Sequence, residues 1–226
     1  MRMSNNAALV NCLIGATVLL ASSATTAETR LAAEVTTLYA EETKVDLKVG
    51  SVAPSFIGTD DQGKAWKSSD HVGKKTVVVY FYPADFTAGC TKQAESWRDN
   101  MNAVVAKGVE VIGVSGDEVM NHKLFKEVWK LNFTLLADGE AAIAKQFGVP
   151  ARGGGKVRPR GPDRQILLDE AGEPIVLERK ATFARWTFVI GKAGTIVYKN
   201  EKVNPAKDSL QVLEFIDGLD EKPATP

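Results

Sequence analysis

The chain has 226 residues, of which 44% are hydrophobic and 25% charged, and its 28 basic residues balance 28 acidic ones. This neutral balance gives no support for a nucleic-acid or membrane-surface partner, because both favour a basic excess. Two cysteines exclude an extensive disulfide framework, and the length fits one domain with an ordinary hydrophobic core.

Residues 1–27 have the layout of a secretory signal peptide. Arg2 precedes a mostly apolar stretch, and the small residues that follow allow cleavage after Ala24 or Ala27. The stretch is short for a membrane span, which needs about 20 residues, so an uncleaved anchor is the weaker alternative. We expect an exported protein, periplasmic or secreted, with no membrane attachment once the signal is removed.

Cysteine usage then directs attention to one residue. The two cysteines are Cys12 and Cys90, and Cys12 would leave with the signal peptide. An exported chain with one remaining thiol cannot form an internal disulfide, so Cys90 stays unpaired.

Beyond a polar leader at 28–46, strand and helix patterns alternate through a domain at 47–220. The patterns predict a hairpin within 55–70, strands at 76–82, 109–115, 133–138, 186–190 and 195–199, and helices at 91–106, 117–130, 141–147 and 206–219. This order predicts an α/β domain with a central mixed sheet and helices on both faces. The last residues, 221–226, should form a mobile tail.

An inserted segment at 151–180 interrupts this alternation. It begins as a loop rich in Gly, Pro and Arg and continues as a hairpin that turns at Ala171-Gly172. Its first half is basic, with only Asp163 opposing five cations: Arg152, Lys156, Arg158, Arg160 and Arg164. The segment is either a solvated, flexible loop or a surface near the site mouth that attracts an anionic reductant or partner.

Cys90 follows a buried strand and a proline-containing loop, where a helix is expected to begin. Thr87 is placed to be the N-cap, with Gly89 and Cys90 in the first turn. Helix N-termini and nearby cations lower the pKa of a cysteine from about 8.5 to roughly 3.5–7.5, and the thiolate is the reactive form. Gly89 leaves room for a small substrate, and Pro83 can wall the site without offering an N–H.

Residues 83–90 read PADFTAGC and match a Pro-x-x-x-Thr-x-x-Cys motif. This motif resembles that of peroxiredoxins, which are thiol peroxidases of the thioredoxin-like fold with a central mixed β-sheet flanked by helices. Four stretches resemble, in order, the subfamily called bacterioferritin comigratory protein or peroxiredoxin Q: FYPADFTAGCTKQAESWRD, GVSGDEVMNHKLFKE, FTLLADGEAAIAKQFGV and RWTFVIGKAGTIVY. The similarity covers roughly residues 45–220 apart from the insertion.

The resemblance implies a role for each residue of the site. Cys90 would be the peroxidatic nucleophile that attacks hydrogen peroxide or an organic hydroperoxide and becomes a sulfenic acid. Thr87 would bind the peroxide, and Arg185 would hold the thiolate ionised and stabilise the leaving oxygen. Plainer alternatives are an inert buried cysteine, a threonine that only caps the helix, and an arginine in a surface salt bridge.

The sequence departs from the subfamily at one position. Many members carry a second cysteine five residues after the first, where this chain has Glu95. We therefore expect a one-cysteine enzyme, reduced by an external thiol that is thioredoxin-like, glutaredoxin-like or small. A disulfide between the Cys90 residues of two chains is a lesser possibility. The resemblance also implies a monomer or weak homodimer.

Two rival functions remain at this stage. A thioredoxin-like disulfide reductase is disfavoured because residues 87–90 read TAGC and supply no C-x-x-C pair. A non-catalytic binding module of the same fold would keep its function after Cys90→Ser. We expect no metal, because His71 and His122 are far apart in sequence and lack partner ligands, and no cofactor.

Overall fold

The computed structural model describes residues 45–220. The expected signal peptide, nearly all of the leader and the tail at 221–226 lie outside these described residues. Within residues 45–220, none of the helices combines the length and the apolar character that crossing a membrane requires.

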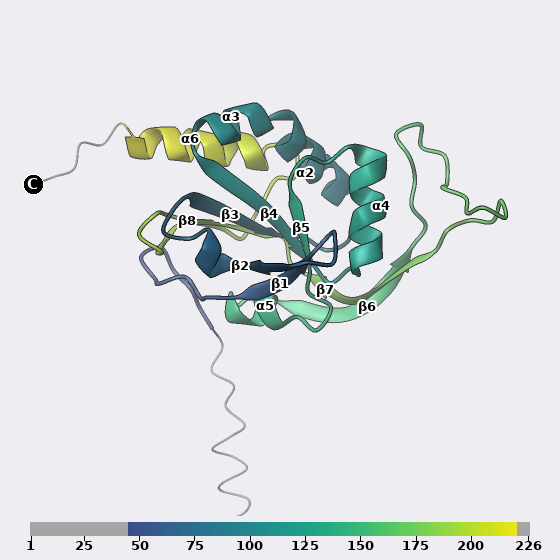
Figure 1. Cartoon of the computed structure of the whole chain (residues 1–226), viewed down its shortest axis with the longest axis horizontal. Coiled ribbons are helices and arrows are strands. Elements are labelled where there is room, and N and C mark those ends of the chain that lie inside the picture. Colours follow the sequence, from purple (N-terminus) through teal and green to yellow (C-terminus); the bar gives the residue numbers. More distant parts are fainter. Residues whose placement is uncertain (1–44, 221–226) are drawn as a thin grey trace, which may run out of the picture. The chain divides into compact units, whose positions relative to one another are not determined.

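A seven-stranded mixed sheet forms the centre of the domain (Figure 1). Its strands, in spatial order, are β2 (Ala65–Lys67), β1 (Ile57–Asp60), β5 (Thr134–Ala137), β4 (Val109–Ser115), β3 (Thr76–Phe81), β8 (Trp186–Ile190) and β9 (Ile196–Asn200). Strands β3, β4 and β5 are parallel, and the other pairs are antiparallel. The central strands are buried on both faces, which is why they read as continuous apolar runs.

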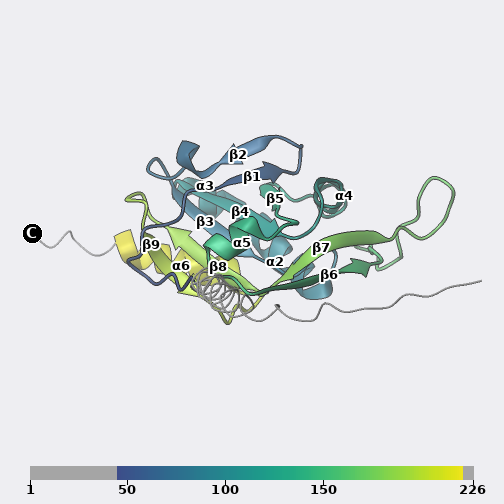
Figure 2. The ribbon, with the colours of Figure 1, turned by 90° about the horizontal axis from the view of Figure 1, so that it is seen from below.

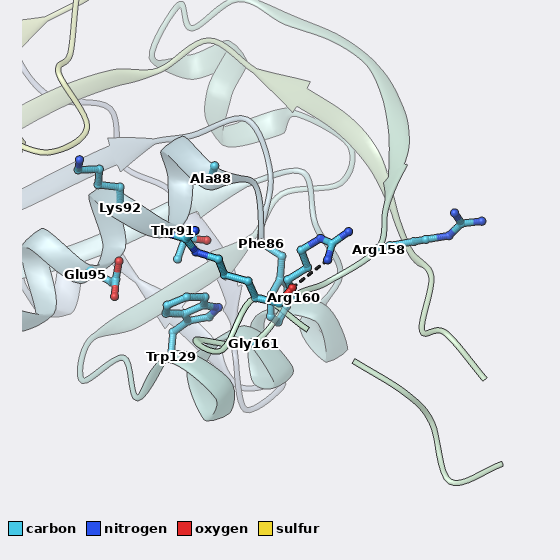
Figure 3. A pocket seen from close by; sticks show the side chains of 10 residues that line it. Phe86, Ala88, Thr91, Lys92, Glu95, Trp129, Arg158, Arg160 and Gly161 are labelled. Atoms are coloured by element: carbon cyan, nitrogen blue, oxygen red, sulfur yellow. Dashed lines mark hydrogen bonds between the residues drawn. The ribbon is translucent and has the colours of Figure 1, made fainter. Parts of the chain in front are cut away.

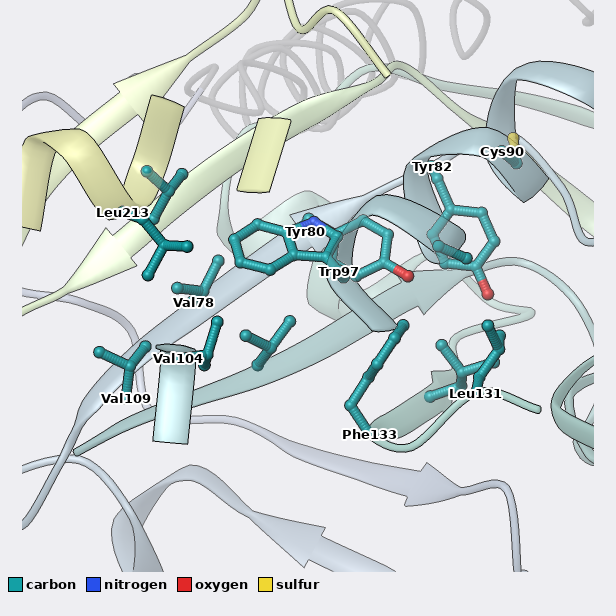
Figure 4. Packing of buried hydrophobic residues seen from close by; sticks show 14 of the residues in the cluster. Val78, Tyr80, Tyr82, Cys90, Trp97, Val104, Val109, Leu131, Phe133 and Leu213 are labelled. Carbon is teal, nitrogen blue, oxygen red and sulfur yellow. The ribbon is translucent and has the colours of Figure 1, made fainter. Parts of the chain in front are cut away.

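Helices cover both faces of this sheet, as predicted. They are α2 (Ala88–Asp99), α3 (Met101–Ala106), α4 (Val119–Trp129), α5 (Ala142–Gln146) and α6 (Asp208–Asp220), with a 3-10 turn, η1, at Ser68–Asp70. Val78 and Tyr80 of β3 lie in one core with buried hydrophobic side chains of α2, α3, α4 and α6. Trp97 of α2 is one of them (Figure 4). Val77 and Val79 point to the opposite face and pack with α5. Alternate residues of one strand thus anchor two separate cores.

The helix predicted at 91–106 is two helices. α2 begins at Ala88, as the N-cap position predicted for Thr87 implies, and stops at Asp99, and α3 starts at Met101 after a break at Asn100. The Asn100 side chain donates a hydrogen bond to the carbonyl of Ser96, 2.8 Å away. Asparagine competes with the backbone in this way, which explains why one amphipathic pattern gives two elements.

The first part of the insertion is a strand and not the loop that its composition suggested. β6 (Ala151–Val157) pairs antiparallel with β7 (Leu177–Phe183), and the predicted turn at Ala171-Gly172 closes the far end, where Gly172 has a φ of 82°. We call residues 151–183 the arm and residues 158–176 its tip. Figures 1 and 2 both show the arm projecting past α4.

Candidate active site

Cys90 is the third residue of α2, immediately after β3 and the loop that contains Pro83. Its side chain is 1% exposed, and it is a free thiol. The preceding Phe86 has a φ of 58°, a left-handed backbone that non-glycine residues seldom adopt. This sharp turn carries the chain from the sheet into the helix and places the cysteine in the first helical turn.

Arg185 brings a cation to the sulfur from a distant part of the sequence. It lies between β7 and β8, and its Nη2 donates to Sγ of Cys90 at 3.2 Å. Hydrogen bonds from a guanidinium favour the charged form of the acceptor, which is the physical basis of the role predicted for Arg185. The structure thus brings together the two residues that the sequence assigned to peroxide chemistry; their roles stay predictions.

A series of hydrogen-bonded side chains, which no sequence pattern predicted, holds Arg185 in place on the side away from the sulfur. Nη1 of Arg185 donates to Oε1 of Gln93, whose own amide donates to Oδ2 of Asp208 at 2.7 Å. The same oxygen accepts hydrogen bonds from Trp97 and Thr187 at 3.1 and 3.0 Å. Burial raises the pKa of Asp208, and the donated bonds oppose that rise. Gln93 could have been found, because it lies one turn after Cys90 on the same helix face.

Thr87 occupies the N-cap position, but its side chain does not cap α2. Its hydroxyl donates to the carbonyl of Ala84 at 3.1 Å, inside the preceding loop. The interpretation of this side chain as a helix cap is therefore wrong. Its oxygen keeps lone pairs free to accept from a peroxide, so the predicted substrate contact is untouched by this correction.

Gly89 and Pro83 shape the surroundings of the sulfur. A Cβ at Gly89 would lie 3.3 Å from Nη2 of Arg185, so the missing side chain makes room for the guanidinium. Pro83 and Arg185 line a depression of about 390 Å³ together with Arg152 and the segment 182–184. Substrate binding at Gly89 and a catalytic role for Pro83 as a wall of the site stay predictions.

The five basic residues of the insertion lie in three different places. Arg152 lies at the depression beside Pro83, whereas Arg158, Arg160 and Arg164 line a different groove along α2. Lys156 forms an exposed ion pair with Glu178. Three arginines of the insertion thus flank the helix that carries Cys90, whereas Arg152 alone lies at the opening beside Arg185.

A second buried polar cluster fixes the loop before Cys90. The carboxylate of Asp85 accepts from the Tyr82 hydroxyl at 2.7 Å and lies 2.8 Å from Nδ1 of His122. The Asp85 N–H donates to Asp117 at 3.0 Å. Burial, and then the charge of Asp85, raise the pKa of Asp117 to about 6. Burial lowers the pKa of His122, but the carboxylate of Asp85 outweighs this and raises it.

The two histidines of the sequence, His71 and His122, each lie against a carboxylate. His122 is engaged with Asp85, and Nδ1 of His71 lies within hydrogen-bond distance of a Glu110 carboxylate oxygen, at 2.8 Å. Within residues 45–220, no three His, Cys, Asp or Glu side chains gather closely enough to hold a metal ion.

A match to the AhpC/TSA family covers residues 49–199, two thirds of the chain. The chain belongs to this family. The match includes Cys90 and Arg185 and spans the insertion.

Known relatives define the group within the family. The chloroplastic peroxiredoxin Q of Oryza sativa subsp. japonica is 39% identical over 171 residues, covering 75% of this chain and 67% of that protein. Peroxidoxin BcpB of Mycobacterium tuberculosis has a similar structure, with a TM-score of 0.62, 26% identity, and coverage of 77% of this chain and 99% of that one. A cysteine-to-serine mutant of PrxQ from Xylella fastidiosa shares the fold, with a TM-score of 0.62, 21% identity, and coverage of 78% and 99%.

These relatives confirm the resemblance and the thioredoxin-like fold that the motif implied. The protein is a peroxiredoxin of the peroxiredoxin Q and bcp group, and therefore a thiol peroxidase that uses a peroxidatic cysteine. Cys90 is the one cysteine that residues 45–220 offer for this role.

Proposed function

We propose that this thiol peroxidase is a one-cysteine enzyme that reduces hydrogen peroxide and organic hydroperoxides through Cys90. The contact of 3.2 Å between Nη2 of Arg185 and Sγ of Cys90 carries the proposal. It places a fixed positive charge where the thiolate must persist and where negative charge must be stabilised during the reaction.

In the first step, the thiolate of Cys90 attacks one peroxide oxygen and the O–O bond breaks. Cys–S⁻, RO–OH and a proton give Cys–SOH and ROH, so the sulfur is oxidised and the peroxide is reduced. Arg185 stabilises the charge that moves onto the leaving oxygen, and the Thr87 hydroxyl orients the peroxide. The N–H groups of the first turn of α2 add fixed dipoles that favour an anion.

The second step needs a thiol from outside the chain. Glu95 occupies the position five residues after Cys90 where many members of the subfamily carry a second cysteine. An external thiol R′SH converts Cys–SOH to Cys–S–S–R′ and water, and a second thiol releases Cys–SH and R′S–SR″. The reductant is a thioredoxin-like or glutaredoxin-like protein or a small thiol.

The enzyme is exported and acts in the periplasm or outside the cell, as a monomer or weak homodimer. The layout of residues 1–27 supports the export proposal, although the rice relative carries a chloroplastic name. Intact mass of the protein purified from its native host should show removal of 24 or 27 residues. A full-length mass would contradict export by cleavage. Sedimentation velocity measures the assembly state.

Rapid mixing of the reduced protein with one equivalent of hydrogen peroxide tests the central proposal. The fluorescence of Trp97, buried in the same core as Cys90, should change quickly, and intact mass should show one added oxygen. Cys90→Ser should show neither change. A reaction no faster than that of a free thiol would contradict the peroxidatic role of Cys90 and favour a non-catalytic binding module.

A further inference from the structure

A groove runs along the outer side of α2, between this helix and the tip of the arm (Figure 3). Its volume is about 880 Å³, and it is lined by Phe86, Ala88, Thr91, Lys92, Glu95, Trp129, Arg158, Arg160, Gly161 and Arg164. This volume lies in the range of sites that hold small molecules and peptides of a few residues. The groove is separate from the depression beside Pro83 and Arg185.

The groove is strongly basic. It contains four cations and one carboxylate, and that carboxylate, on Glu95, already lies 3.6 Å from a nitrogen of Arg98 outside the lining. Lys92 and Arg164 make no hydrogen bond or ion pair through their side chains within residues 45–220. The guanidinium of Arg160 donates only to the backbone carbonyl of Arg164, at 2.8 Å. Unpaired cations in a concave site concentrate anions from solution.

The backbone presents these arginines in a defined turn. Gly161 donates to the carbonyl of Gln165 at 3.0 Å, and Arg164 donates to that of Gly161 at 2.9 Å. Figure 3 shows Arg158 directed away from Thr91 and the other lining residues, at the rim of the groove. The tip is therefore ordered by its own hydrogen bonds at the side of α2.

The position of the groove relative to Cys90 suggests what it serves. Ala88 and Thr91, which line it, belong to the same helical turn as Cys90. The sulfur itself is 1% exposed, so a thiol larger than a peroxide reaches it only when this turn moves. A molecule seated in the groove is then beside the sulfur as it becomes accessible.

We propose that this groove binds the reductant, and that the reductant is a small thiol carrying carboxylate groups. The inference rests on the proposed one-cysteine function and names the chemical class of its second substrate. Lys92, Arg160 and Arg164 bind the carboxylates, and the bound thiol attacks the sulfenic sulfur of Cys90. A mixed disulfide forms, water leaves, and a second thiol molecule completes the reduction.

The test measures how fast the oxidised enzyme is reduced by thiols of different charge. The wild type and Arg160→Gln/Arg164→Gln are oxidised with one equivalent of peroxide and mixed with mercaptosuccinate, 2-mercaptoethanol or cysteamine. With mercaptosuccinate at low ionic strength, the second-order rate constant should fall about tenfold in the double variant. With neutral 2-mercaptoethanol it should change less than twofold, and with cationic cysteamine it should not fall. Comparing variant with wild type for each thiol cancels differences in intrinsic thiol reactivity.

Two matched variants separate charge from structure. Arg160→Lys/Arg164→Lys keeps both charges and should stay within about threefold of the wild type with mercaptosuccinate. Lys156 and Lys192, the latter in the turn between β8 and β9, do not line the groove, so Lys156→Gln/Lys192→Gln changes the net charge equally and should leave the rate constant unchanged. Salt at about 0.5 M should abolish most of the difference between the wild type and the glutamine variant.

The two reactions distinguish loss of charge recognition in the groove from loss of the one-cysteine function. If the wild type does not react rapidly with peroxide, the one-cysteine function fails. If oxidation is rapid but all three thiols are slowed equally in the glutamine variant, or none is, charge recognition in the groove is refuted. The proposal is also overturned if only a protein thiol reduces the oxidised enzyme rapidly and the reduction rate does not saturate with increasing mercaptosuccinate.

Discussion

The side chains around Cys90 form a relay in which each member orients the next. Asp208 holds Gln93, Gln93 holds one nitrogen of Arg185, and the other nitrogen of Arg185 contacts the sulfur. Only a planar guanidinium offers two donors in a fixed fork for this geometry. The buried carboxylate therefore acts on the sulfur through two intermediates.

Arg185→Lys should lower the second-order rate constant with hydrogen peroxide by about 100-fold, because a single ammonium lacks the planar fork whose two nitrogens contact Gln93 and the sulfur separately. Stopped-flow fluorescence measures this constant. Arg152→Lys is the matched control, since Arg152 lies at the same depression without contacting Cys90. Equal rates for the wild type and Arg185→Lys would contradict the role of Arg185.

Asp208→Ala should destabilise the domain by about 3 kcal/mol or more, because three buried donors lose their acceptor. Asp208→Asn should cost about 1 kcal/mol, since its remaining oxygen can occupy the position of Oδ2. The other oxygen of Asp208 has no partner within residues 45–220, so replacing it with an amide breaks no bond there. Urea unfolding measures both costs, and equal costs would refute this explanation.

Sequence reasoning identified part of this relay. Cys90 belongs to a local motif, and Arg185 was found through a resemblance that extends across the insertion. Asp208 could not be found, because it lies 115 residues from Gln93 in the sequence and meets it only in the folded sheet-and-helix packing. Its residue type, an acid at the start of a helix, equally fits an ordinary helix terminus.

At the scale of elements, the arm depends on close contact between two strands. A Cβ at Gly154 would lie 1.9 Å from the carbonyl oxygen of Arg179, whereas a Cβ at the adjacent Gly153 would meet nothing within 4 Å. Glycine is depleted in strands, which is why the composition of β6 predicted a loop. The buried strands were predicted to within a residue or two because their β-branched and aromatic runs are continuous.

Gly154→Ala should loosen the arm while Gly153→Ala leaves it intact. Trypsin cleaves after arginine and lysine except before proline, so Arg160 and Arg164 report on local opening of the tip, whereas Arg158 precedes Pro159 and is not a cleavage site. The rate of cleavage there should rise about tenfold in Gly154→Ala, because the added methyl group cannot fit beside the Arg179 carbonyl. Similar rates in the two variants would show that this close contact does not hold the strands together.

For the whole molecule, the buried cluster of Asp85, His122 and Asp117 links stability to pH. The pKa of Asp117 is about 6 against an ordinary value of 3.8, and that of His122 is also raised. Both groups bind protons more tightly in the folded state than in the unfolded chain. The contribution of His122 is therefore complete below about 6.5 and is lost as pH rises through its folded pKa, while that of Asp117 grows as pH falls below 6.

The free energy of unfolding should accordingly increase by about 1–2 kcal/mol between pH 8 and pH 5. Asp117→Asn should flatten this slope, because it removes one of the two groups and keeps an oxygen for the Asp85 N–H and the Ser115 hydroxyl. Urea unfolding at intervals of half a pH unit measures the slope. A free energy of unfolding that decreases from pH 8 to pH 5 in the wild type would contradict the raised pKa values of Asp117 and His122.

Sequence reasoning gave the fold class of the molecule but not the order of its strands. Parallel pairing of β3, β4 and β5 follows from the alternation of strands and helices. The placement of β1 and β2 beside β5, and of β8 beside β3, depends on contacts between residues far apart in the chain. No local pattern contains that information.

The arm has one further consequence, for how such an enzyme can evolve. Its inner end is fixed where Ala151 pairs with Phe183, two residues before Arg185, and its outer end carries the arginines of the groove. Adding two residues to each strand would move the tip outward by about 7 Å without changing that inner pair. Natural selection can therefore lengthen, shorten or recharge the tip while the peroxide chemistry at Arg185 is inherited unchanged.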